Sequence, residues 1–263
     1  EIIPVSGAAS TAAVVAFNTF LYDKILVVKT GYYSDRWYQY LTKNKIAKFV
    51  KEVSYNNFLK EKNIKTFNWV VFVYVETASC VKFDIKEIKK ICLKNKIRLM
   101  VDATASIGLE KNHNLADVIF FSSCKGLFGP TGLGFISYKK NLVLSESKDF
   151  ILNYKTHKNS MYTLGYNCMA ALYSISKKHL LLKKKILYAN KVISKFRLFK
   201  KNNPMIGIAL KHKIKNKKNN NSIFYKSRLD PGYDVIFFLG LTKFDQKQIK
   251  YILKKRIISN LKK

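Results

Sequence analysis

Short apolar runs alternate with amphipathic segments through the first half of the chain. Five runs are β-branched or aromatic and apolar on both faces, which is typical of buried strands. They cover residues 24–28, 68–75, 97–102, 117–123 and 133–138. Two intervening segments, 10–22 and 83–95, have helical spacing. This order predicts an α/β fold with a largely parallel sheet.

The pattern changes after residue 140. The spacing predicts one long helix over roughly 166–200, and then strands in "MIGIAL" and "DVIFFLGL" and an amphipathic helix over 244–257. We therefore expect a large domain over 1–165, a connecting helix over 166–200 and a smaller C-terminal α/β domain over 201–263. The polar run "KHKIKNKKNNN" predicts a solvated loop. Because the sequence begins "EIIPVSGAAS", without Met, we expect a further segment upstream.

Composition narrows the class of protein. With 263 residues, of which 48% are hydrophobic, the chain is long enough for a substantial core. It has no apolar run long enough to span a membrane and no signal-peptide pattern, so we expect no membrane association. The four cysteines form no CxxC pair, which favours neither a metal site nor a disulfide scaffold. A reduced, cytoplasmic setting follows.

The net charge of +33 raises nucleic acid as a partner. Only five of the 49 basic residues are Arg, the preferred reader of phosphate and guanine. The lysines also accompany Ile and Asn rather than forming a patch. Specific nucleic-acid binding is therefore a rival interpretation that we disfavour, and salt-dependent retention on DNA would distinguish it.

Candidate chemistry lies at the ends of the predicted strands, where functional residues of α/β sheets gather. Asp102 ends the apolar run "IRLMVD", and Lys125 follows the next run before the turn "GPTGLGF". The small residues of "VSGAAST" lead into a helix and favour phosphate binding. Each also has a plainer interpretation: a loop hydrogen bond for Asp102, a surface lysine for Lys125, and tight packing for the small residues.

The combination favours one cofactor. A partly desolvated lysine has a lowered amine pKa, which favours the neutral nucleophile that forms a Schiff base. Pyridoxal phosphate needs such a lysine, an acid for its ring nitrogen, an aromatic face and an anion-binding turn. The aromatic is supplied by "GYYSDR".

These segments resemble the class V, fold-type-I pyridoxal-phosphate aminotransferases. The resemblance is closest to the clade of 2-aminoethylphosphonate–pyruvate and alanine–glyoxylate transaminases. It is clear over residues 5–140 and faint over 160–257. It implies the fold-type-I sheet with a smaller C-terminal α/β domain. The cysteine desulfurases share the fold but have a stacking His where this chain has Tyr33, so we disfavour that branch.

The resemblance assigns roles residue by residue. Lys125 is the catalytic residue and covalent anchor, and Asp102 is the partner of the ring nitrogen. Tyr33 stacks on the ring, and Thr77 in "ETAS" lies near the phenolic oxygen. The phosphate contacts are implied to be Ala8, Ala9 and Ser10, together with Thr163 in "MYTLGYNCMAAL" from the second subunit of a homodimer.

Besides lacking the family's usual N-terminal segment, the given sequence departs from this pattern in three places. Ala8 and Ala9 replace the Ser and Gly of the usual phosphate turn. Cys124 replaces the Asn or Gln that usually precedes the lysine. The position of the substrate-carboxylate Arg is occupied by Val235 or Ile236. We therefore expect the chain to transaminate poorly unless Arg36, Arg228 or one of the many lysines substitutes.

We therefore expect an aminotransferase that moves an amino group from a small donor, with 2-aminoethylphosphonate favoured, to a keto acid, with pyruvate favoured. One alternative is an alanine– or serine–glyoxylate transaminase. Another is a truncated relative that keeps the fold without catalysis. No metal is expected.

Overall fold

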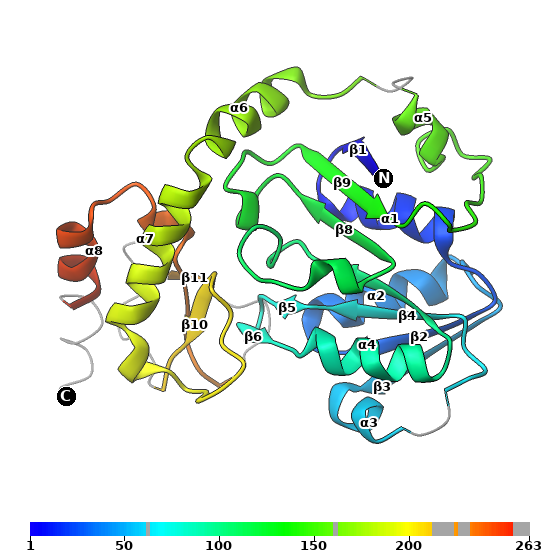
Figure 1. The fold of residues 1–263 in the computed structure, drawn as a ribbon, viewed down its shortest axis with the longest axis horizontal. Coiled ribbons are helices and arrows are strands. Elements are labelled where there is room, and N and C mark those ends of the chain that lie inside the picture. Colours follow the sequence, from blue (N-terminus) through cyan, green and yellow to red (C-terminus); the bar gives the residue numbers. More distant parts are fainter. Residues whose placement is uncertain (62–63, 160–162, 212–223, 226–231, 255–263) are drawn as a thin grey trace.

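A central sheet of seven strands forms the largest part of the computed structural model (Figure 1). The structure describes all residues except 62–63, 160–162, 212–223, 226–231 and 255–263. In sheet order the strands are β1 (Ile2–Ser6), β9 (Leu133–Tyr138), β8 (Val118–Ser122), β7 (Arg98–Asp102), β4 (Trp69–Val73), β2 (Lys24–Lys29) and β3 (Phe49–Ser54). Strand β9 runs antiparallel to its neighbours β1 and β8, and all other adjacent strands of the sheet are parallel. The predicted largely parallel α/β fold is confirmed.

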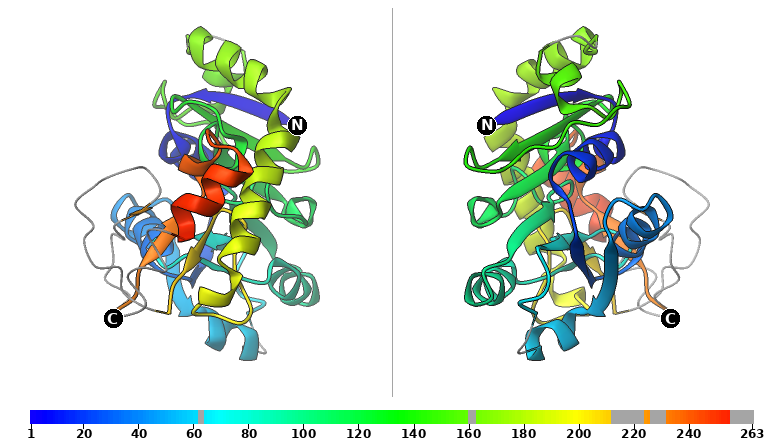
Figure 2. Two further views of the ribbon diagram at one scale, coloured as in Figure 1. Left: turned by 90° about the vertical axis from the view of Figure 1, so that its left-hand side faces the viewer. Right: turned by 90° about the vertical axis from the view of Figure 1, so that its right-hand side faces the viewer.

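Helices cover both faces of this sheet, which explains why its strands are apolar on both sides (Figure 2). Val71 of β4 lies in one core with α1 (Ala9–Phe20) and α2 (Tyr32–Lys43). Its neighbour Phe72 lies in the opposite core. The helices of that second layer are α3 (Tyr55–Lys60) and α4 (Ile85–Lys94).

Strand register places the candidate strand ends side by side. Val73, the last residue of β4, pairs with Asp102, the last residue of β7, and Asp102 in turn pairs with Phe120 of β8. Because these three strands are parallel, their carboxyl ends meet at one edge of the sheet. Lys125 follows β8 by three residues and therefore lies at the same edge.

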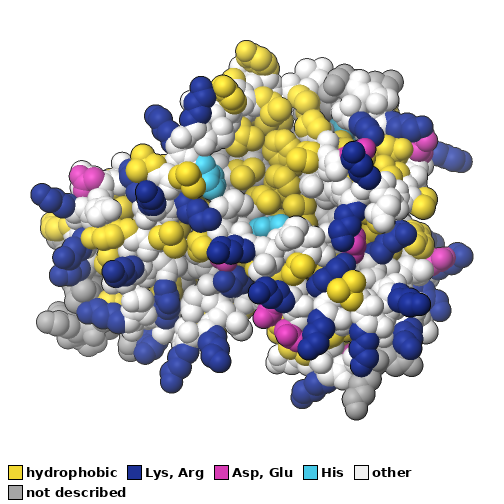
Figure 3. Space-filling view, in the orientation of Figure 1, with side chains coloured by type: hydrophobic (Ala, Val, Ile, Leu, Met, Phe, Trp, Pro, Cys, Tyr) yellow, Lys and Arg dark blue, Asp and Glu magenta, His cyan; other side chains and the backbone are white. Residues whose placement is uncertain are grey.

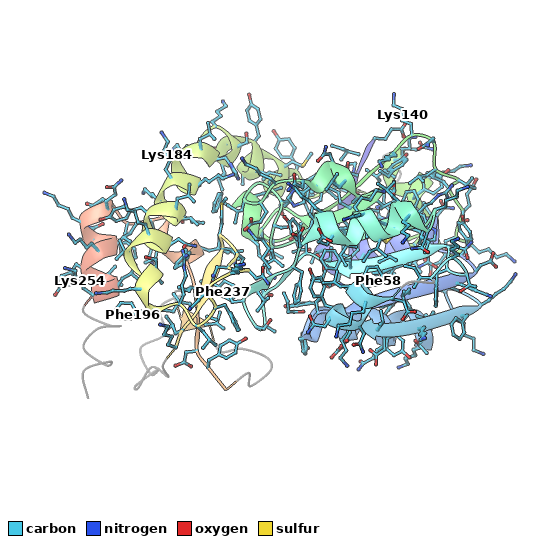
Figure 4. The ribbon with its side chains drawn as sticks, turned by 60° about the horizontal axis from the view of Figure 1, so that its bottom comes forward. Phe58, Lys140, Lys184, Phe196, Phe237 and Lys254 are labelled. Carbon is cyan, nitrogen blue, oxygen red and sulfur yellow. The ribbon has the colours of Figure 1, made fainter. Side chains whose placement is uncertain are left out.

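The C-terminal part forms a second, smaller layer. Its three antiparallel strands are β10 (Gly207–Ala209), β12 (Val235–Phe237) and β11 (Phe224–Tyr225). Strands β10 and β12 share a core with α7 (His179–Val192) and α8 (Gln246–Leu253), and Figure 4 shows Phe237 beside α7. The predicted division of the chain at residues 165 and 200 stays a prediction.

The long helix that we expected over 166–200 is interrupted. It consists of α6 (Tyr166–Ser176), α7, and a 3₁₀ turn η3 (Ser194–Phe196). At the break, Lys178 donates its backbone N–H to the carbonyl of Ile175. The break separates two environments, since α7 buries Ile186 and Ala189 against the small sheet whereas α6 buries no residue. The sequence over 166–200 has helical spacing throughout, so it does not show that the two halves have different packing environments.

Other boundaries also differ from the predictions. The run 68–75 divides between β4 and the hairpin of β5 (Val75–Glu76) and β6 (Val81–Lys82). The second tail strand ends at Phe237 and continues into a 3₁₀ turn, η4 (Leu239–Leu241). The remaining short elements are η1 (His113–Leu115), η2 (Lys125–Leu127) and α5 (Tyr154–Lys158). Most of the predicted solvated loop, and the end of the predicted helix 244–257, lie outside the described residues.

The lysines are spread over the surface. Lys140, Lys184 and Lys254 project from separate parts of the molecule (Figure 4). Among the described residues, no helix is long and apolar enough to cross a membrane. In the same part of the chain, no group of three or more His, Cys, Asp or Glu residues is placed to hold a metal ion.

Candidate active site

A pocket of about 180 Å³ lies where β4, β7 and β8 end and α1 begins. Its lining includes seven candidate residues from the sequence: Ala8, Ala9, Ser10, Tyr33, Thr77, Asp102 and Lys125. Thr163 lies apart from them, on the exposed segment before α6. One chain thus brings together every predicted cofactor contact except the one expected from a second subunit.

Lys125 places its amine between an aromatic ring and a hydroxyl. It begins η2, directly after β8, with a left-handed backbone (φ 56°). Its Nζ lies 5.0 Å from the centroid of the Tyr33 ring and 3.4 Å from Oγ1 of Thr77. Lys125 therefore forms part of the pocket wall.

The turn after Lys125 is packed too closely for a larger side chain. A Cβ at Gly126 would collide with the carbonyl oxygen of Ile107. The backbone N–H of Gly129 donates to the carbonyl of Ser123 (2.8 Å), which closes the turn. Nε2 of His179, from α7, lies 3.1 Å from the carbonyl oxygen of Gly126. The glycine-rich segment therefore fixes the backbone that carries the lysine.

Asp102 is buried, and both of its carboxylate oxygens are hydrogen-bonded. Oδ2 accepts the indole N–H of Trp37 (3.0 Å), and Oδ1 accepts the backbone N–H of Thr104 (2.9 Å). The loop hydrogen bond that we weighed as the plainer interpretation is present. It coexists with a second donor, and the carboxylate still lines the pocket.

Glu76 is a second buried acid beside the pocket. Oε2 accepts the backbone N–H of Tyr33 (2.9 Å), and Oε1 accepts that of Ala78 (3.0 Å). Burial raises the pKa of Glu76 to about 7, against the lowering effect of these two bonds, and nearby Asp102 raises it further.

The start of α1 has no side-chain cap. Ala8 is the N-cap residue and makes no capping bond, and the first turn has no acidic residue. The backbone N–H of Gly7 donates to the carbonyl of Gly132 (2.9 Å), which joins this start to the turn after Lys125. The positive end of a helix dipole therefore borders the pocket.

The residues present fit pyridoxal phosphate. The uncapped start of α1 suits its phosphate, and the Tyr33 ring and the amine of Lys125 suit its ring and aldehyde. Oγ1 of Thr104, which also lines the pocket, is buried without a hydrogen-bond partner among the described residues. A buried hydroxyl normally has a partner, so a polar ligand in the pocket would satisfy it.

Sequence reasoning missed three residues of this site. Trp37 follows Tyr33 by four positions, so a helix starting at "GYYSDRW" would have placed both on one face. Glu76 was overlooked within "ETAS", although an acid between an apolar strand and small residues needs donors. Thr104 was overlooked in the loop that follows Asp102.

The structure also shows where the residues that depart from the family pattern lie. Cys124 lines the pocket, with its Sγ 3.0 Å from Oγ of Ser122. Val235 and Ile236 are buried in β12 and provide no cation. Arg36 lines the pocket. Arg228 lies outside the described residues.

Comparisons with known proteins identify the family. The model of the family "aminotransferase class-V" matches residues 1–153. Pyridoxamine–pyruvate aminotransferase from Mesorhizobium loti is similar in structure, with a TM-score of 0.81 and 14% identity over 100% of this chain and 80% of that chain. An aspartate aminotransferase of subgroup IV from Thermus thermophilus has a TM-score of 0.75 and 15% identity over 98% of this chain and 86% of that chain.

Ureidoglycine–glyoxylate aminotransferase from Bacillus subtilis has a TM-score of 0.71 and 15% identity, over 97% of this chain and 80% of that chain. The chain has no significant match among curated proteins. At these identities the structural likeness shows the fold, and the family model shows membership. The chain belongs to the class V aminotransferase family. It is a transaminase whose cofactor is pyridoxal phosphate.

Proposed function

We propose that the chain transfers an amino group from 2-aminoethylphosphonate to pyruvate, with Lys125 as the catalytic residue. One observation supports the roles that we propose for the pocket residues. A single pocket is lined by an amine, a buried carboxylate, an aromatic ring, a hydroxyl and an uncapped helix start. These groups come from five segments that are distant in sequence, so a chance arrangement of surface side chains is a poor explanation.

Lys125 and Asp102 have the two chemical roles. Pyridoxal phosphate, when bound, supplies an aldehyde carbon and a ring that accepts electrons from the substrate carbon. Nζ of Lys125 would hold the cofactor at that carbon, and the same nitrogen, when free, would accept and return a proton. Asp102 keeps a facing ring nitrogen protonated, because a buried carboxylate favours the positively charged form of its partner.

The other residues of the pocket hold and orient the cofactor. Tyr33 and Thr77 both contact the amine of Lys125, so Tyr33 would cover the ring and the hydroxyl of Thr77 would lie near the ring's phenolic oxygen. The backbone of Ala8 and Ala9 and the hydroxyl of Ser10 bind the phosphate at the start of α1. Since the two alanines supply no hydroxyl, the helix start carries most of this contact.

Arg36 is the residue that we assign to the substrate's anionic group. Both favoured substrates are anions, and β12 offers only Val235 and Ile236. Arg36 lines the pocket and makes no salt bridge within the described part of the chain. Its guanidinium carbon lies 5.3 Å from the centroid of the Trp37 ring, which leaves its donors open to a carboxylate or phosphonate.

The acceptor is a small keto acid. The neighbour named for pyridoxamine and pyruvate supports pyruvate, and the neighbour named for ureidoglycine and glyoxylate supports the second candidate, an alanine– or serine–glyoxylate transaminase.

We also propose a homodimer in which Thr163 reaches the phosphate bound by the partner. Thr163 lies just before α6, a helix that buries no residue and exposes Tyr166 and Tyr173. Hydrophobic side chains gather on the face of the molecule that α6 borders (Figure 3). A second copy that covers this face would bury apolar area and bring a second Thr163 toward the pocket.

Half-reaction spectroscopy tests the substrate assignment. Cofactor-loaded protein is mixed separately with 2-aminoethylphosphonate, alanine and serine, and the absorbance of the lysine-bound cofactor is followed. Pyruvate or glyoxylate is then added and recovery of the band is measured. We expect fastest loss with 2-aminoethylphosphonate and fastest recovery with pyruvate. Faster reaction with alanine or serine and glyoxylate would favour the second candidate, and a protein inert to all donors would be a non-catalytic relative.

A further inference from the structure

Glu76 is hydrogen-bonded to the backbone at or next to the two residues that contact the amine of Lys125. The contacting groups are the ring of Tyr33 and the hydroxyl of Thr77. One oxygen of Glu76 accepts the backbone N–H of Tyr33, and the other accepts that of Ala78, the residue after Thr77. A single carboxylate therefore joins the backbone on both sides of the amine.

The contact between α2 and Glu76 is close. A Cβ at Gly31, the N-cap of α2, would lie 2.7 Å from Cγ of Glu76, and the backbone there has φ 149°. Only glycine adopts this conformation readily and leaves room for the side chain. The start of α2, the helix that contains Tyr33, therefore packs directly against the side chain of Glu76.

Glu76 itself is fully buried and does not line the pocket. Any effect that it has on the cofactor must therefore pass through Tyr33 and Thr77. We propose that Glu76 is a positioning residue that fixes the separation between the Tyr33 ring and the Thr77 hydroxyl, and so the slot for the cofactor ring in front of Lys125. The inference rests on the roles proposed above for these three residues.

The charge of Glu76 makes this separation sensitive to pH. Two charged groups face it, Asp102 at the end of β7 and Lys125 in η2. Burial raises its pKa to about 7, so protonation occurs near neutrality. A protonated carboxyl accepts the two backbone N–H groups less strongly, since bonds to an ionised acceptor are the stronger kind. Cofactor affinity should therefore fall as the pH drops below about 7.

The test is cofactor titration of the apo protein at about pH 6 and about pH 8, for the wild type and for Glu76→Gln. Gln has nearly the same shape but turns an NH₂ donor toward one of the two backbone donors. Glu110→Gln is the matched control, because Glu110 is also a buried acid that accepts a backbone N–H, from Met205, away from the pocket.

We expect Glu76→Gln to weaken binding of pyridoxal phosphate at about pH 8 by about tenfold to a hundredfold, the value of a hydrogen bond to a charged group. The variant should also lose the pH dependence that the wild type and Glu110→Gln share. If the Gln variant fails to fold, Glu76→Asp replaces it, since the shorter acid keeps the charge but cannot reach both N–H groups.

Equal affinity and an equal pH profile in the wild type and the Glu76 variant would overturn the inference. Failure of this inference can be distinguished from failure of the proposed residue roles. If only the inference about Glu76 fails, wild-type protein saturated with cofactor still gives a borohydride-stable adduct on Lys125. If the residue roles fail, it gives none.

Discussion

The indole N–H of Trp37 donates to Oδ2 of Asp102 across 3.0 Å, and this bond joins α2 to the end of β7. The Trp37 ring is held edge-on against Phe17 and Phe120, with centroid separations of 5.6 and 5.7 Å. A tightly packed ring has few positions to adopt, so the direction of its N–H is fixed. The side-chain packing of the core therefore sets the orientation of the acid in the pocket.

Replacement of Trp37 by Phe should weaken cofactor binding more than it destabilises the fold. The variant removes a donor to an ionised acceptor, a contact worth roughly 1.5–3 kcal/mol. Trp69→Phe is the matched control, because Trp69 is fully buried and its indole N–H has no partner among the described residues. Both variants should lower the unfolding temperature, and only Trp37→Phe should raise the cofactor Kd. Equal Kd values would show that Trp37 merely fills space.

The raised pKa of Glu76 predicts a pH-dependent difference in stability. The folded-state pKa of about 7 exceeds the ordinary value of 4.5, so the folded protein holds a proton that the unfolded chain releases between these values. Wild-type stability therefore falls as the pH rises from about 4.5 to about 7. The Glu76→Gln variant should not lose stability in this way, because the Gln side chain does not titrate.

Denaturant unfolding of both apo proteins at about pH 5 and about pH 8 measures that difference. Relative to the wild type, Glu76→Gln should gain on the order of 3 kcal/mol between the two conditions, from 1.36 kcal/mol for each pKa unit. Stability curves that run parallel in the two proteins would contradict a raised pKa.

The sequence predicted the parts of the fold that carry a strong local pattern. The strand 133–138 was predicted with its observed bounds, and Lys125 and Asp102 were placed at neighbouring strand ends. The edge strand β3 was missed because charged residues interrupt "FVKEVS", which is only half-buried. α2 was missed because it buries only three residues, among them Trp37, and is otherwise polar.

The site was harder to predict where contacts join distant segments. The donor to Asp102 is 65 positions away in the sequence, and the donor from Tyr33 to Glu76 is 43 positions away. A single sequence shows that a buried acid needs donors, but the sheet register and the seating of α2 decide which donors reach it. The pairing of Trp37 with Asp102 and of Tyr33 with Glu76 could therefore be identified only from the structure.

The exposed tyrosines on α6 offer a test of the proposed dimer. Tyr173 is 67% exposed in the single chain, and Tyr173→Glu would place a charge in the proposed apolar interface. Light scattering should show a dimer for the wild type and a monomer for the variant. Tyr251→Glu is the control, since Tyr251 is similarly exposed (61%) but lies on α8. A wild-type monomer that holds stoichiometric cofactor would refute the dimer.

Arg36→Gln should impair the reaction with keto acid. Loss of a charged partner for a desolvated carboxylate costs roughly 2–5 kcal/mol, which corresponds to about 30- to 4,000-fold. The rate constant for pyruvate with protein carrying the aminated cofactor should fall by that factor. Arg98→Gln is the control, because Arg98 begins β7, at the opposite end from Asp102, and lies over Trp69. An unchanged rate in Arg36→Gln would exclude Arg36 from substrate binding.

Borohydride reduction of the cofactor-loaded protein, followed by peptide mass mapping, tests the central claim most directly. Lys125 is the lysine whose amine lies in the pocket between Tyr33 and Thr77. We predict one reduced cofactor adduct per chain, on the peptide that contains Lys125, and none in Lys125→Ala. An adduct on another lysine, or no adduct in protein saturated with pyridoxal phosphate, would contradict the account.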